Sequence, residues 1–85
     1  MTDLYTPTLT ERVEQARLRK GIAITEHMQL SHILNVSYEA GLNELVLLRL
    51  KNLYSESAEA TAVAIAHYNA LKLELYFNKM GALDA

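Results

Sequence analysis

The chain has 85 residues, 51% of them hydrophobic and none of them cysteine, and its formal net charge at pH 7 is −2. This length allows one domain, residues 1–85, but buries only roughly 60–65% of the surface that the unfolded chain exposes, so we expect dense helix packing or oligomerisation to stabilise it. The mildly acidic balance argues against a general nucleic-acid binder, which normally carries a basic excess.

Two further absences bear on the compartment. The first residues lack the basic stretch followed by an apolar run that is typical of a signal peptide, and no window approaches 18 apolar residues without charge. The lack of cysteine fits a reducing environment. We therefore expect a cytoplasmic protein that does not cross a membrane.

The first predicted helix begins after a flexible arm, residues 1–8, which contains the only proline. Thr8 has Glu11 three residues further on, the spacing of a capping box, so we expect the helix to start at Leu9. From there, positions on one face recur with gaps of four and three, as in a coiled-coil seam. The seam positions are Leu9, Val13, Ala16, Lys20, Ala23, His27, Leu30 and Leu34.

Gly21 lies in the middle of this run. A glycine inside a helix costs about 1 kcal/mol relative to alanine, and it can instead end the helix. Thr25 could then cap a second helix that starts at Glu26. We expect a break or kink near residues 21–25, with one long helix as the alternative.

The next predicted helix, Tyr38 to Tyr54, is unusually apolar. Asn35 and Ser37 favour a helix boundary, and Ser37 can act as the cap. Apolar side chains then cover most of the helix circumference, so this helix must be covered on two sides. They are Leu42, Leu45, Val46, Leu47, Leu48, Leu50, Leu53 and Tyr54.

The last predicted helix spans residues 58–80, with Ser55 or Ser57 as its cap and Gly81 as the glycine that closes it. Its first half is rich in alanine and its second half in bulky side chains, which suggests a tapered contact with the leucine-rich helix. Residues 82–85 should fray. The sequence therefore predicts an all-α fold: a small bundle of three or four helices, with the long C-terminal helix packed antiparallel on the leucine-rich central helix.

The candidate chemical groups do not form a site in the sequence. His27 and His32 are five residues apart, which places them about 140° apart on a helix, whereas a helical zinc pair needs a spacing of four. His67 stands alone, the serines lie where caps are expected, and the three glycines are far apart. We expect no metal site, no cofactor and no enzymatic activity.

Two segments resemble the lambda-repressor-type helix-turn-helix domains. The run LTERVEQARLRKGI at residues 9–22 is similar to their first helix, and LNVS at residues 34–37 is similar to the turn before their recognition helix. The resemblance implies a DNA-binding regulator with basic contacts from Arg12, Arg17, Arg19 and Lys20. The segment after the turn carries two acids and no Arg or Lys, where a groove-reading helix needs donors, so DNA binding is kept as an alternative.

The surplus of apolar helix surface favours association with another protein. We expect a small non-enzymatic regulatory or adaptor protein, such as an inhibitor, an antiactivator or a chaperone-like protein, with a charged rim that sets orientation. The expected binding residues are Leu42, Val46, Leu47, Arg49, Leu50, Lys51 and Tyr54. A structural homo-oligomer, a homodimer in which the apolar face pairs with itself, is the other alternative.

Overall fold

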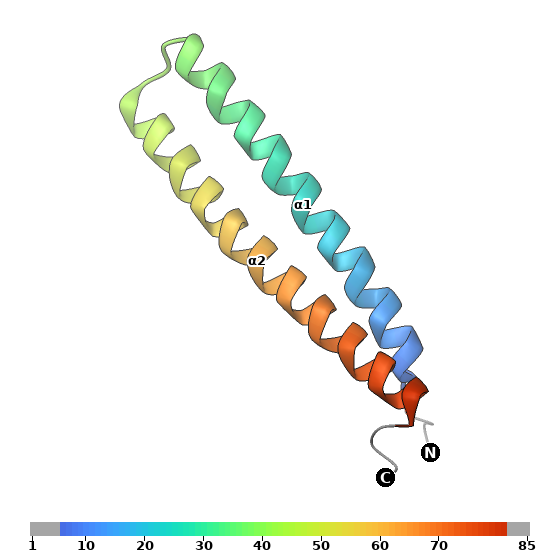
Figure 1. Cartoon of the computed structure of the whole chain (residues 1–85). Helices are drawn as coiled ribbons and strands as arrows, with labels where there is room; N and C mark the ends of the chain where they lie inside the picture. Colours follow the sequence, from blue (N-terminus) through green and yellow to red (C-terminus); the bar gives the residue numbers. More distant parts are fainter. Residues whose placement is uncertain (1–5, 82–85) are drawn as a thin grey trace, which may run out of the picture.

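The computed structural model describes residues 6–81, which form two helices, α1 (Leu9–Glu39) and α2 (Glu44–Met80). The helices lie side by side and antiparallel, so that the start of α1 and the end of α2 meet at one end of a hairpin (Figure 1). The expected all-α class is confirmed. The prediction of three or four helices is wrong, since residues 6–81 contain only these two.

The start of α1 confirms the predicted capping box. The Glu11 amide donates to Thr8 Oγ1 at 3.2 Å, and the Thr8 amide donates to Glu11 Oε1 at 2.9 Å. These bonds satisfy two backbone donors that a helix start otherwise leaves without partners, and they fix Leu9 as the first helical residue. Most of the expected arm, residues 1–5, lies outside the described residues, as does the expected frayed tail, residues 82–85.

The predicted break near residues 21–25 is wrong, because α1 is continuous through Gly21. The Thr25 hydroxyl donates to the Gly21 carbonyl at 2.9 Å instead of capping a new helix. On both sides of Gly21 the seam continues, with Lys20 and Ala23 half-buried against α2. A break would unpair backbone groups and interrupt this contact, which outweighs the cost of about 1 kcal/mol for one glycine.

The turn between the helices is at Gly41, not at residues 35–37. Gly41 has φ +69°, its amide donates to Tyr38 O at 3.1 Å, and the Leu42 amide donates to Ser37 O at 3.2 Å. This pair of bonds is the Schellman motif that closes a helix at a left-handed glycine. Asn43 then caps α2, with its side chain accepting from the Leu45 amide at 2.7 Å. Ser37 is therefore a buried residue of the last turn of α1 and not a cap.

The predicted junction at residues 55–57 is also wrong, because α2 runs unbroken to Met80. The Ser57 hydroxyl donates to the Tyr54 carbonyl at 2.8 Å within the helix. The leucine-rich and alanine-rich segments thus belong to one helix of about 55 Å and cannot pack on each other; both pack on α1. The glycine expected to close the helix is confirmed, with φ 69° at Gly81.

A single seam joins the two helices. All eight predicted seam positions in α1 are buried or half-buried, and nine positions in α2 with the same three–four spacing face them. The α2 positions are Leu47, Leu50, Tyr54, Ser57, Thr61, Ala64, Tyr68, Leu71 and Leu75. Among residues 6–81, Ala16 and Leu71 are the only buried apolar residues, so the hairpin has almost no core of its own.

Neither of the two described helices contains a stretch long and apolar enough to span a bilayer.

Candidate protein-binding surface

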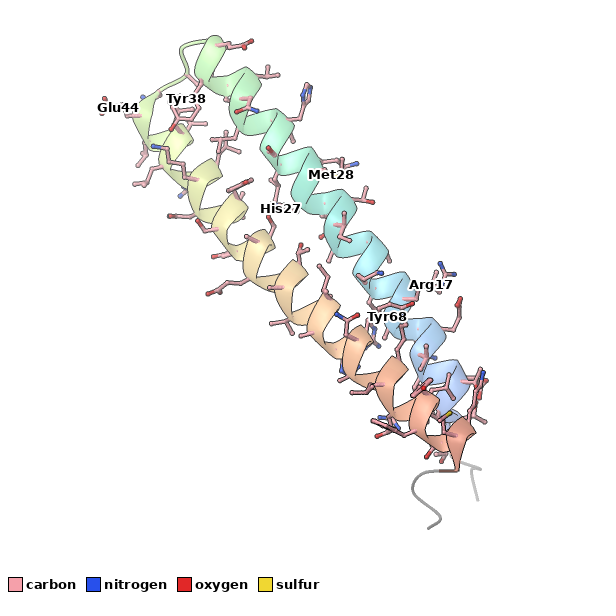
Figure 2. The ribbon with its side chains drawn as sticks, viewed as in Figure 1. Arg17, His27, Met28, Tyr38, Glu44 and Tyr68 are labelled. Atoms are coloured by element: carbon pink, nitrogen blue, oxygen red, sulfur yellow. The ribbon has the colours of Figure 1, made fainter. Side chains whose placement is uncertain are left out.

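The middle of the seam is polar. His27 Nδ1 lies 2.7 Å from Ser57 Oγ, and the His27 ring stacks on the Tyr54 ring with centroids 4.5 Å apart. Figure 2 shows His27 directed toward α2. One turn further along α2, Thr61 Oγ1 lies 3.1 Å from the Ala23 carbonyl and 2.7 Å from the Ser57 carbonyl. These contacts link α1 to α2 at one fixed register.

The His27–Ser57 pair joins the two helices. Ser57 Oγ also donates to the Tyr54 carbonyl at 2.8 Å, so this serine hydrogen-bonds both within α2 and across the seam. Over residues 6–81, no three acidic or histidine side chains gather closely enough to hold a metal ion.

The predicted binding residues fall into two groups. Leu47, Leu50 and Tyr54 are half-buried in the seam, where they face α1. The other four are exposed: Leu42, Val46, Arg49 and Lys51. Lys51 Nζ lies 5.3 Å from the centre of the Tyr38 ring, which ties this lysine to the end of α1. The sequence located the apolar segment but could not say which of its sides faces the neighbouring helix.

The hairpin has two flat faces, and different residues lie on each. A groove on one face is lined by Arg19, Glu56, Glu59, Val63 and His67 and by three small side chains, Ala16, Ala60 and Ala64. Side chains seven residues apart lie on the same side of a helix. Ile33 follows Arg19 by two such intervals, and Leu53 and Val46 precede His67 by two and three. These three apolar residues therefore lie on the same face as the groove.

This face becomes apolar toward the turn. We call its exposed apolar side chains the groove patch, and each is between 43% and 48% exposed. The groove patch consists of Ile33, Val46 and Leu53, to which we add Val36, about one turn after Ile33, and Leu42, in the turn that joins the helices. Arg49 is exposed at its rim, whereas Lys51 lies on the opposite face beside Tyr38. The binding residues predicted from the sequence include Leu42, Val46 and Arg49 but not Ile33 and Val36 of α1 or Leu53 of α2, because these three join the patch only through the pairing register of the two helices.

A second apolar surface runs along the outer side of α2, and its first residue, Val63, also lines the groove. Its six positions have gaps of three and four, and every one is exposed. We call it the outer stripe: Val63, Ala66, Ala70, Leu73, Phe77 and Met80. Leu73 lies two residues after the buried Leu71, or about 200° around the helix, so the stripe points away from the seam. Its spacing was visible in the sequence but was assigned to a contact within the chain.

The four basic residues of the DNA-binding alternative do not share a surface. Arg12 and Arg19 lie on one side of α1, while Arg17 lies about 160° around the helix from Arg19. Arg17 donates to both Glu14 carboxylate oxygens at 2.6–2.9 Å, and these hydrogen bonds lower the pKa of Glu14 and raise the pKa of Arg17. Lys20 is half-buried, with Nζ 4.2 Å from the centre of the Tyr68 ring.

The helix-turn-helix resemblance is not supported by the fold. Residues 34–37, which resemble the turn of that motif, are helical and lie within α1. No family model matches the chain, and no curated protein or solved structure is significantly similar to it. The exposed surfaces of the hairpin are therefore the best guide to its function.

Proposed function

We propose that this chain is a small, non-enzymatic regulatory or adaptor protein that binds another protein through the groove patch. The observation that carries the proposal is the position of five exposed apolar side chains on one face, contributed by both helices and the turn. A contiguous apolar surface rimmed by polar residues is characteristic of a protein interaction site. By covering an apolar segment of its partner, the chain would act as an inhibitor, an antiactivator or a chaperone-like protein.

The shape of this face fits an amphipathic helix of the partner. The groove lies between two antiparallel helices, and beyond the groove patch its lining includes three alanines, which allow a third helix to approach closely, beside Glu56 and Glu59. Apolar anchors of the partner helix would lie between Ile33 and Leu53. Arg49 at the rim favours a partner with a carboxylate beside those anchors, which would set the direction of the bound helix.

Leu53→Asp tests this proposal. Leu53 lies outside the seam, so the substitution should leave the helical circular dichroism unchanged, while the buried aspartate should weaken partner binding at least ~10-fold. The matched control is Leu48→Asp on the opposite face of the same helix, since Leu48 is 54% exposed and Leu53 48%. Wild type and both variants would be immobilised, and proteins retained from the native host would be quantified by mass spectrometry.

The expected result is a protein that wild type and Leu48→Asp retain and that Leu53→Asp loses. Equal retention by both variants would show that the groove patch is not the docking site. By contrast, Leu47→Asp places the charge in the seam and should reduce helix content itself, so it serves as the reference for a folding defect.

A further inference from the structure

We infer that a second copy of this chain docks on the outer stripe of α2, antiparallel to it, and forms a two-fold symmetric dimer. The outer stripe and the groove patch share no residue, although Val63 of the stripe also lines the groove beyond the patch, and this inference does not rest on the proposed function. Three features of the stripe support this dimer: its spacing, the order of its side-chain sizes and the polar residues that flank it.

The spacing of the outer stripe is that of a helix paired with another helix. From Val63 to Met80 the gaps are three, four, three, four and three, and no polar residue interrupts the six positions. This is the same alternation that joins α1 to α2 on the other side of the helix. The stripe is roughly 25 Å long. It therefore has the pattern of a second seam, and residues 6–81 of one copy provide no helix to fill it.

The order of side-chain sizes selects the antiparallel arrangement. The first three positions are small or medium and the last three are large, with Leu73, Phe77 and Met80 at the end nearer the C-terminus. In a two-fold pairing centred between residues 70 and 73, Ala70 faces Leu73 of the second copy. The next layers pair Ala66 with Phe77 and Val63 with Met80.

Every layer of this pairing thus combines a smaller and a larger side chain, so that the two helices can approach evenly and fill the contact. A parallel pairing would place Phe77 on Phe77 and Ala66 on Ala66, and would pack unevenly. Because both copies present the same surface, the contact is closed by symmetry and does not continue into a filament.

Polar residues beside the stripe are complementary in the same arrangement. His67 is near Glu74 of the second copy, and Asn69 is near Tyr76 of the second copy, each contact occurring twice. No two like charges are brought together. These groups would form a polar rim around the apolar contact.

The exposed area of one copy also favours pairing. The accessible surface of the chain is 6742 Å². A compact folded monomer of this mass exposes about 5,100 Å², so the whole chain exposes about a third more than a compact chain would. A standard interface buries about 800 Å² on each partner, which this excess readily supplies.

The first test is the mass in solution, measured by light scattering over a range of concentrations. Wild type should have about twice the chain mass of 9.6 kDa, and Leu73→Glu should raise the dimer dissociation constant by roughly 100-fold or more because it buries an unpaired charge. The matched control, Leu18→Glu on the outer side of α1, should remain dimeric, since Leu18 and Leu73 are 53% and 55% exposed.

The second test exchanges the two side chains nearest the two-fold axis. Leu73→Ala leaves a gap and Ala70→Leu adds bulk opposite Leu73, so each single variant should weaken the dimer. The double variant Ala70→Leu/Leu73→Ala restores one large and one small side chain in the layer, and should dimerise within a few-fold of wild type. This test keeps the stripe apolar, so it does not depend on how a charged variant folds.

The third test reads the direction of pairing, since the natural chain has no cysteine. Ala66→Cys mixed with Phe77→Cys should form a disulfide between the two variants, while neither alone should cross-link efficiently, because identical positions lie roughly 16 Å apart along the axis. Cross-linking of each variant with itself would indicate parallel pairing and overturn the inference.

A wild-type chain that is monomeric at all concentrations, or a dimer equally sensitive to Leu18→Glu and Leu73→Glu, would also overturn the inference. Light scattering measures the dimer and retention on immobilised protein measures partner binding, so either proposal can fail without the other. Loss of the dimer in Leu53→Asp but not in Leu73→Glu would place the second copy on the groove patch instead, which contradicts both assignments.

Discussion

Two glycines of α1 and its turn differ in what their backbone requires. Gly21 is in the middle of a helix, and a Cβ built on it would have no other atom within 4 Å. Gly41 has φ +69°, a conformation that side chains disfavour. We therefore expect Gly21→Ala to raise the free energy of unfolding by about 0.5–1 kcal/mol, and Gly41→Ala to lower it by about 1 kcal/mol.

Urea denaturation at a fixed chain concentration would measure both glycine variants, each serving as the control for the other. Stabilisation by Gly41→Ala would mean that the turn does not need its left-handed glycine. A loss of stability in Gly21→Ala would show instead that α1 bends at this position, as the sequence had suggested.

At the scale of the helices, local signals predicted ends well where a side chain or glycine bonds the backbone directly. Thr8 with Glu11, and Gly81, are examples. Serine was misleading, because a serine hydroxyl can cap a helix or bond within one, and Ser57 does the latter while also hydrogen-bonding His27. Whether a serine caps a helix or bonds within it depends on the helix packed opposite, which the sequence of one segment does not show.

The binding surface was predictable only in part for the same reason. The leucine-rich segment was recognised as needing cover, but Leu47 and Leu50 are covered within the hairpin. The three–four spacing of α2 alone could have separated the seam from the outer stripe. The groove patch could not have been derived in this way, because Ile33 and Leu53 join one face only once the register of the two helices is known.

That register should depend on the polar layer around His27. His27→Ala removes a stacked ring and the hydrogen bond to Ser57, so we expect it to lower the free energy of unfolding by about 1–3 kcal/mol. His32→Ala is the control, since His32 is exposed on the same helix and its loss should change the value by less than about 0.5 kcal/mol. Equal effects of the two variants in urea denaturation would mean that the layer contributes nothing specific.

In the molecule as a whole, the two helices contact each other along one seam, and this limits how much apolar surface they can bury. Each helix buries one side against the other, and the opposite sides face solvent whatever their composition. In this chain the opposite side of α2 is apolar from Val63 to Met80. In the dimer that we infer, the second copy supplies the hydrophobic stabilisation that a third or fourth helix would otherwise supply.

A dimer that supplies this stability makes unfolding depend on concentration. Because two folded copies give two unfolded chains, mass action favours the folded dimer as concentration rises. With an enthalpy of about 0.7 kcal/mol per residue over both copies, the Tm should rise by about 4 °C for each tenfold increase in chain concentration. Circular dichroism melts of wild type from about 5 to 500 µM would measure this, and Leu73→Glu should melt at a lower temperature that does not change with concentration. A wild-type Tm that stays constant over this range would mean that each hairpin is stable alone.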